Sequence, residues 1–150
     1  LCLVVHPVMA NEASPEQVVH RLFDAMRAGN GAAVLDLVQP DAPLERLMPD
    51  GTIKKGSFVK WASWIDTLAP GDADEQIFGV TSFHSAPGLA TVSAPFMVYL
   101  HGELVGCGVN QFNFARVTEG WRIIHGIDVP HDGDCATFRD DYMAKAKSTP

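Results

Sequence analysis

The chain has 150 residues, 47% of them hydrophobic, and a formal net charge of −7. This is the length of one average domain, with enough apolar material for a core and too little charge for a disordered chain. The excess of Asp and Glu over Lys and Arg argues against nucleic acid or an anionic membrane surface as a partner, and no apolar run approaches the roughly 18 residues of a membrane span.

The first residues have the features of the end of a secretory signal peptide. An apolar start is followed by Val8-Met9-Ala10, which places small or aliphatic residues where signal peptidase reads them. We therefore expect residues 1–10 to be a signal-peptide remnant and residues 11–150 to form a single domain that is periplasmic or secreted. The alternative is a short apolar extension that packs on the domain.

Three helices are predicted in the first half of the chain, each preceded by a capping residue. Ser14 and Gln17 form a capping box in front of an amphipathic run that Gly29 ends. Asn30 can cap a short second helix, and Ser57 can cap a third helix whose apolar residues recur at spacings of three and four. These apolar faces need a second layer to cover them.

The second half of the chain supplies that layer, because its apolar residues alternate with the period of a strand. Segregated helices and strands indicate the α+β class, here a bent antiparallel sheet of four strands with three helices on its concave face. A small hairpin is also expected ahead of the third helix, at residues 43–48 and 52–55. The long strands are predicted at residues 77–85, 89–100, 103–117 and 121–129, with a weak helix at 136–146.

This order of elements, over about residues 14–129, resembles the nuclear transport factor 2-like superfamily, which includes SnoaL-like polyketide cyclases and ketosteroid isomerases. The resemblance implies a cone-shaped α+β barrel with a pocket between sheet and helices, often dimeric through the outer sheet face. It does not imply isomerase chemistry, because Arg46 stands where ketosteroid isomerases carry their base carboxylate. The stretches that carry the likeness are Ser14-Pro15-Glu16, Pro40-Asp41-Ala42, Glu119-Gly120-Trp121-Arg122-Ile123 and, for exported bacterial members of unassigned function, Cys107-Gly108-Val109-Asn110-Gln111-Phe112.

Strand parity predicts which side chains face the pocket. Among them His125 is the candidate general acid or base near neutral pH, and Asn110 could hold a substrate carbonyl. The alternative for both residues is a structural hydrogen bond. Tyr99 is either a donor at the mouth of the cone or a half-buried aromatic residue. The predicted pocket side chains are Tyr99, Asn110, Phe112, Phe114, Trp121, Ile123 and His125.

The cysteines and the acidic tail leave two further alternatives. In an exported chain Cys107 and Cys135 could form one disulfide, but two unpaired thiols is the interpretation we prefer, with Cys107 on the face opposite Asn110. The stretch from His125 to Cys135 contains residue types that bind metals, yet a solvated acidic loop is the better reading. No metal and no cofactor are predicted.

The sequence therefore predicts an exported domain that binds a small, apolar molecule in its cone. Two alternatives stay open, a lyase or isomerase that uses His125 as acid or base, and an interaction module without a ligand. A homodimer is expected through the outer sheet face that carries Val105, Cys107 and Val109, because no predicted element covers these side chains.

Overall fold

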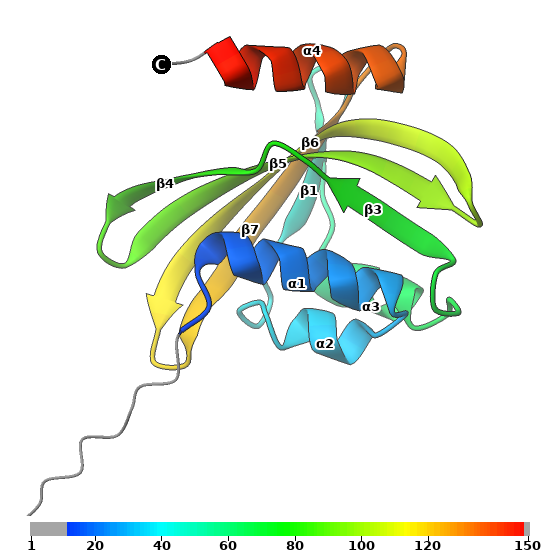
Figure 1. The fold of residues 1–150 in the computed structure, drawn as a ribbon. Helices are drawn as coiled ribbons and strands as arrows, with labels where there is room; N and C mark the ends of the chain where they lie inside the picture. The colour runs from blue at the N-terminus through cyan, green and yellow to red at the C-terminus, as the bar shows by residue number, and fades with distance from the viewer. Residues whose placement is uncertain (1–11, 149–150) are drawn as a thin grey trace, which may run out of the picture.

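The computed structural model describes residues 12–148, in which helices pack against a bent sheet that does not close (Figure 1). The expected signal-peptide remnant at residues 1–10 lies outside these described residues. The helices are α1 (Pro15–Arg27), α2 (Gly31–Leu35), α3 (Phe58–Ile65) and α4 (Cys135–Ser148). The strands are β1 (Leu44–Leu47), β2 (Ile53–Lys54), β3 (Ala73–Ile77), β4 (Thr81–Ala86), β5 (Leu89–Leu100), β6 (Glu103–Val117) and β7 (Gly120–Pro130).

The first three helices begin at the residues that the sequence predicts. The Ser14 hydroxyl accepts from the Gln17 backbone N–H, and the Gln17 side chain accepts from the Ser14 backbone N–H, which completes the capping box. The Asn30 side chain caps α2, and the Ser57 hydroxyl caps α3. These bonds satisfy backbone donors that a helix start otherwise leaves without partners.

The strands form one sheet with the order β2-β1-β7-β6-β5-β3, in which β4 also pairs with β5. β5, β6 and β7 form the antiparallel meander that the sequence predicts, with turns at Gly102 and Gly120. Within the described residues the sheet has seven strands, however, and not the expected four. Two of the added strands, β1 and β2, are the expected hairpin, and they extend the sheet at the side where β1 runs parallel to β7. The third arises at the other side, where β3 and β4 both pair with β5.

Two local features account for this difference. The strand expected at residues 77–85 is interrupted at residues 78–80, because Gly79 takes a φ of 54° and Phe78 turns toward α4. β3 therefore ends at Ile77, and β4 begins at Thr81. β1 lies against β7 because Leu44 packs over Gly126, where a Cβ would lie 2.9 Å from Leu44 Cδ1. A glycine in β7 therefore creates the space that β1 fills.

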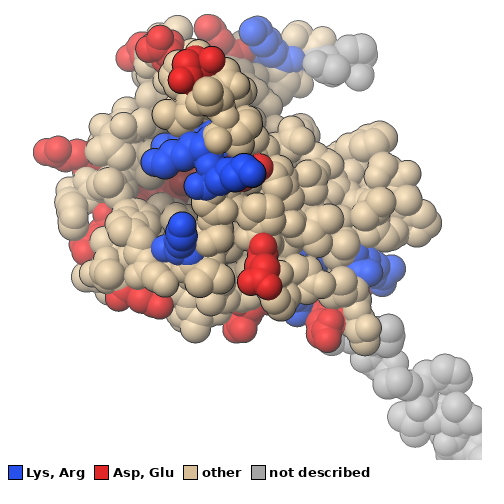
Figure 2. Space-filling model, turned by 180° about the vertical axis from the view of Figure 1, so that it is seen from behind, with Lys and Arg blue, Asp and Glu red and all other residues tan. Residues whose placement is uncertain are grey.

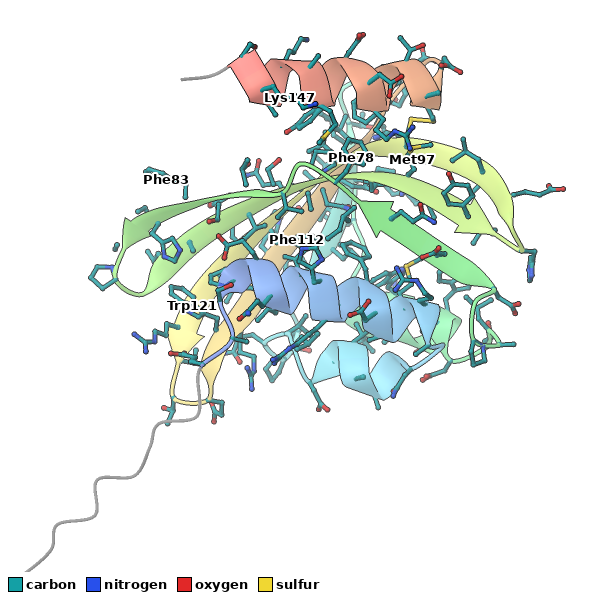
Figure 3. All side chains as sticks on the ribbon, viewed as in Figure 1. Phe78, Phe83, Met97, Phe112, Trp121 and Lys147 are labelled. Carbon is teal, nitrogen blue, oxygen red and sulfur yellow. A yellow bond between two sulfur atoms is a disulfide. The ribbon has the colours of Figure 1, made fainter. Side chains whose placement is uncertain are left out.

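Helices cover both faces of the sheet. α1, α2 and α3 lie on the concave face, and α4 lies on the convex face (Figure 1). Figure 3 shows Phe112 and Trp121 on the side of α1, whereas Phe78 and Met97 point toward α4. The main core fills the concave side and combines Leu22 and Phe23 of α1, Phe58 and Ile65 of α3, and Val92, Phe112, Phe114 and Ile123 of the sheet.

A disulfide holds α4 on the convex face. Cys107 of β6 is bonded to Cys135, so our preference for two unpaired thiols is wrong. The prediction that Cys107 lies on the face opposite Asn110 is confirmed by the alternation along β6. Because α4 covers Cys107, the outer sheet face is less bare than the sequence suggests, although Val105 stays 55% exposed.

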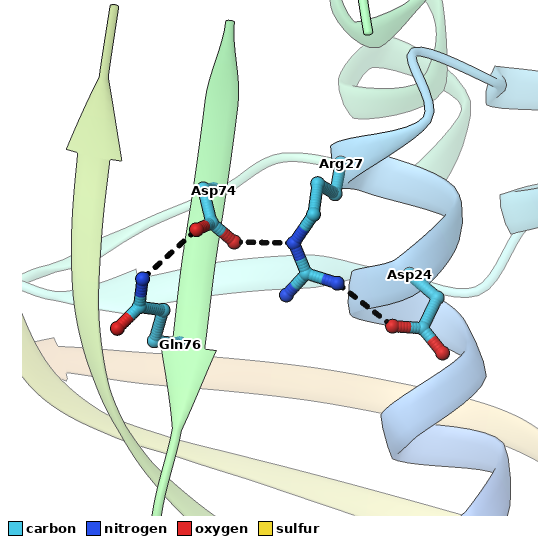
Figure 4. Close-up of polar contacts among 4 residues, drawn as sticks. All are labelled: Asp24, Arg27, Asp74 and Gln76. Carbon is cyan, nitrogen blue, oxygen red and sulfur yellow. Dashed lines mark hydrogen bonds and ion pairs between the residues drawn. The ribbon is translucent and has the colours of Figure 1, made fainter. Parts of the chain in front are cut away.

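An ion-pair network joins α1 to the edge strand β3 (Figure 4). Arg27 Nε donates to Asp74 Oδ1 at 2.6 Å, and the same guanidinium donates to Asp24 at 2.9 Å. Gln76 donates to the second oxygen of Asp74 at 2.9 Å. Partial burial alone would raise the pKa of Asp74, but the bonds from Gln76 and Arg27 outweigh it and lower that pKa. The ionised carboxylate thus fixes the position of β3 against α1.

Candidate functional site

A cavity of about 360 Å³ lies between the concave face of the sheet and helices α1 and α3. Its inner wall is apolar and largely aromatic. It is formed by Leu22, Phe23, Phe58, Trp61 and Phe112, of which all but Trp61 are buried. Such a volume is at the lower end of the range for small-molecule sites, which are usually apolar with a few polar groups.

Two polar side chains meet in this wall. Asn110 of β6, only 6% exposed, donates through Nδ2 to Glu75 Oε1 of β3 at 2.6 Å. Burial raises the pKa of Glu75 to about 7, and the nearby Asp128 carboxylate adds to the increase. The hydrogen bond from Asn110 and the charge of Arg46 act in the opposite direction. Near neutral pH this carboxyl group is therefore present in both protonation states, so that it can donate a proton or accept one.

A bidentate ion pair lies beside these two residues. Arg46 of β1 donates to Asp128 of β7 through Nε at 2.8 Å and Nη2 at 2.6 Å. Asp128 is also the register partner of Asn110, so the pair sits next to the polar centre of the cavity. Asp128 balances the charge of Arg46. Glu75 of β3 is the acidic residue that contacts Asn110 in the cavity wall.

His125 lies on the opposite face of the sheet, so the prediction that it faces the pocket is wrong. Asn113 pairs with His125 but Phe114 pairs with Ile123, which makes Ile124 an extra residue in β7. This β-bulge reverses the alternation beyond it. His125 Nε2 lies 3.0 Å from Glu45 Oε2, and Nδ1 lies 3.3 Å from Asn113 Nδ2.

The other predicted pocket residues divide into two groups. Asn110 and Phe112 line the cavity. Phe114, Ile123 and Trp121 are buried in the core, and Tyr99 is half-buried on β5 outside the cavity wall. Sequence reasoning missed Glu75, although the alternation Ala73, Glu75, Ile77 places it on the face of two apolar neighbours.

Two residues of the acidic tail have structural partners. The Asp134 carboxylate accepts from the Thr137 backbone N–H at 2.8 Å, and the His131 ring stacks on Phe138. Within residues 12–148, no three His, Cys, Asp or Glu side chains are grouped as metal ligands. In the same part of the chain, no helix combines the length and the apolar character that crossing a bilayer requires.

The comparisons with known proteins identify the fold. No family model and no curated protein sequence matches the chain. An NTF2-like protein with a cystatin-like fold from Novosphingobium aromaticivorans superposes with a TM-score of 0.63 at 18% identity, over 82% of this chain and 83% of that one. An NTF2-like protein of unknown function from Pseudomonas putida gives 0.62 at 16% identity, over 81% and 87%.

A third structure with the same fold is the association domain of CaMKII from C. elegans, with a TM-score of 0.60 at 13% identity over 75% of this chain and 90% of that one. Identities this low establish the fold alone, since one fold serves unrelated functions. The chain therefore has the NTF2-like fold that the sequence predicts, and its function has to be argued from the cavity.

Proposed function

We propose that the protein binds a small, mostly apolar molecule in the cavity and holds one polar atom of it at Asn110 and Glu75. The observation that carries this proposal is a cavity of about 360 Å³ with a largely aromatic inner wall, in which Asn110 and Glu75 form a hydrogen-bonded polar pair. Each 100 Å² of apolar ligand surface removed from water contributes on the order of 2.5 kcal/mol. The aromatic rings therefore supply the affinity, and the polar pair selects the orientation.

An uncharged aromatic probe tests the proposal. N-phenyl-1-naphthylamine fluoresces when it enters an apolar site, and we expect saturable binding of one probe per chain. Leu44→Trp should weaken binding by roughly tenfold or more, because Leu44 lines the cavity and a larger ring would occupy part of it. Leu47→Trp is the matched control, since Leu47 is on the same strand but outside the cavity wall.

Two results would count against the proposal. The first is a wild-type chain that does not bind the probe. The second is equal binding by the wild type, Leu44→Trp and Leu47→Trp, which would place the probe elsewhere on the molecule. Circular dichroism of each variant shows whether it has folded before binding is compared.

A second candidate function is proton transfer by Glu75, in a lyase or isomerase reaction. A carboxyl group with a pKa of about 7 in an apolar wall favours it, because a base works best when its pKa is near the working pH. The base-catalysed opening of 5-nitrobenzisoxazole, which requires only removal of one carbon-bound proton, provides the test. We expect the wild-type chain to open this compound at a rate that rises with pH around 7, and Glu75→Gln to have lost this activity. An equal rate for the wild type and Glu75→Gln would contradict this function.

We also propose that the protein works outside the cytoplasm as a homodimer. The Cys107–Cys135 disulfide supports export, because such bonds persist in oxidising compartments. Exposed Val105 and Val129 on the outer sheet face support association, as does the resemblance to an association domain. Mass spectrometry of chain recovered from the periplasm or the medium tests export, and an N-terminus at Asn11 is the expected result.

A further inference from the structure

Beyond this apolar site, the mouth of the cavity carries a positive charge that no ion pair within residues 12–148 balances. Lys54, Lys55 and Lys60 line the cavity and are exposed, whereas the apolar wall behind them is mostly buried. We propose that the ligand is an amphipathic anion, with an apolar body inside the cavity and a carboxylate, sulfate or phosphate group held by these lysines. This inference rests on the proposed function, and it specifies the chemical class of the molecule that binds.

The placement of these lysines is unusual for the composition of the chain. The sequence contains five lysines and a net charge of −7, yet three of the five lie at this one opening. The other two, Lys145 and Lys147, lie in α4 on the convex face of the sheet. Figure 2, which shows the molecule from behind, has a group of Lys and Arg side chains near the middle of the view, with acidic side chains around it.

Each acidic residue of the cavity lining is bound to another group, and the Glu45 side chain points to the convex face. Asp128 pairs with Arg46, and Glu45 pairs with His125. Glu75 accepts from Asn110. In the part of the chain that the structure describes, none of the ion pairs involves one of the three mouth lysines. Their charges are thus free to attract an anion.

The arrangement also fixes the orientation of the ligand. An anionic group at the inner end would lie beside Glu75, whose own ionisation near pH 7 makes that position unfavourable. The same group at the mouth meets three ammonium ions and remains partly hydrated, so it loses little solvation. Nucleic acid does not fit this site, because an acidic surface surrounds only a few lysines.

Two dyes with the same ring system separate the charge from the apolar body. 8-Anilinonaphthalene-1-sulfonate carries a sulfonate that N-phenyl-1-naphthylamine lacks. We expect the sulfonate to bind the wild-type chain more tightly at low salt. The triple variant Lys54→Gln, Lys55→Gln, Lys60→Gln should bind it roughly tenfold more weakly, since each exposed charge contributes modestly, and should bind the neutral dye as the wild type does.

The matched control removes three positive charges from α4, as Arg139→Gln, Lys145→Gln, Lys147→Gln, and should leave both affinities unchanged. Salt of about 1 M should bring the wild-type affinity for the sulfonate close to that of the triple mouth variant. Equal loss of sulfonate binding in the two triple variants would overturn the inference, because net charge alone would then explain it.

The remaining outcomes separate this inference from the proposed function. If the wild type binds both dyes equally and the mouth variant changes neither affinity, the cavity binds apolar molecules but the inference about the anion is wrong. If the wild type binds neither dye, both the proposed function and the inference fail. Tighter binding of the sulfonate that is lost only in the mouth variant supports both.

Discussion

Asp74 and Glu75 are neighbours on β3, yet their surroundings shift their pKa values in opposite directions. The folded chain holds the Glu75 proton up to about pH 7, whereas the ordinary pKa is 4.5. Between these pH values the folded state binds more protons than the unfolded state, so the free energy of unfolding falls as pH rises, by up to about 3 kcal/mol. Glu75→Gln should remove this dependence.

This prediction is measured by urea unfolding from about pH 2.5 to 8, a range that covers the ordinary pKa of Asp74, 3.8, and that of Glu75. We expect Glu75→Gln to be about 1–3 kcal/mol more stable than the wild type at pH 8, because an ionised carboxylate is no longer enclosed there. Asp74→Asn is the control, because Arg27 and Gln76 favour the ionised form of Asp74. The stability that this carboxylate contributes is present above its unfolded pKa and is lost as pH falls, which is the opposite pH dependence to that of Glu75. Identical pH profiles for the wild type and Glu75→Gln would contradict the account of Glu75.

His125 is a structural residue in this account. It bridges Glu45 and Asn113 on the convex face, and Asn113 also accepts from Thr91, so polar side chains of four strands are joined. His125→Ala should lower the free energy of unfolding by about 1–2 kcal/mol, because it leaves partners unsatisfied in a partly buried position. Binding of N-phenyl-1-naphthylamine should not change. Weaker binding with unaltered stability would instead assign His125 to the ligand site.

At the scale of elements, α4 depends on its disulfide more than on packing. None of its residues is buried, and its ring contacts are those of Phe138 and Tyr142 with Phe78 and of Phe138 with His131. The Cys107–Cys135 bond closes a loop with a sequence separation of 28, and such a loop contributes about 2–4 kcal/mol. Replacing both cysteines with serine should lower the melting temperature and expose α4 to trypsin.

Reductant provides the control for this prediction. It should lower the melting temperature of the wild type toward that of the double serine variant, and it should not affect the variant itself. A wild-type chain whose melting temperature and trypsin pattern are the same with and without reductant would show that α4 is held by its ring contacts.

Local signals explain which elements the sequence could predict. Helix caps at Ser14, Asn30 and Ser57 and turns at Gly102 and Gly120 act over a few residues, so the corresponding helices and strands were found. The faces of residues were harder to predict, since a strand period of two holds only until one residue is inserted.

The positions of the site residues and of α4 depend on four features that local patterns do not encode. The bulge at Ile124 moves His125 out of the pocket. The Cys107–Cys135 bond and the parallel pairing of β1 with β7 join segments that lie far apart in the sequence. Glu75 enters the site from an edge strand that also lies far from Asn110 in sequence. Asn110 and Phe112 were predicted correctly as cavity residues, because no bulge separates them and they share one face of β6.

At the scale of the whole molecule, the outer sheet face should mediate a homodimer. Val105 and Val129 are 55% and 41% exposed on this face, beside the area that α4 covers. Light scattering should give twice the mass of one chain for the wild type and one chain for Val105→Glu, Val129→Glu. Val59→Glu, at a similarly exposed valine of α3, should remain dimeric. A wild-type monomer at the highest attainable concentration would refute this association.

The central claim is that the cavity between the sheet and the helices is a ligand site, and nuclear magnetic resonance tests it most directly. When N-phenyl-1-naphthylamine is titrated into isotopically labelled protein, we expect the largest shifts at the Trp61 indole N–H, the Asn110 side-chain amide and the backbone of Phe23. These groups should move together with one affinity. Shifts confined to the convex face, around Val105 and α4, with the Trp61 and Asn110 signals unchanged, would contradict the claim.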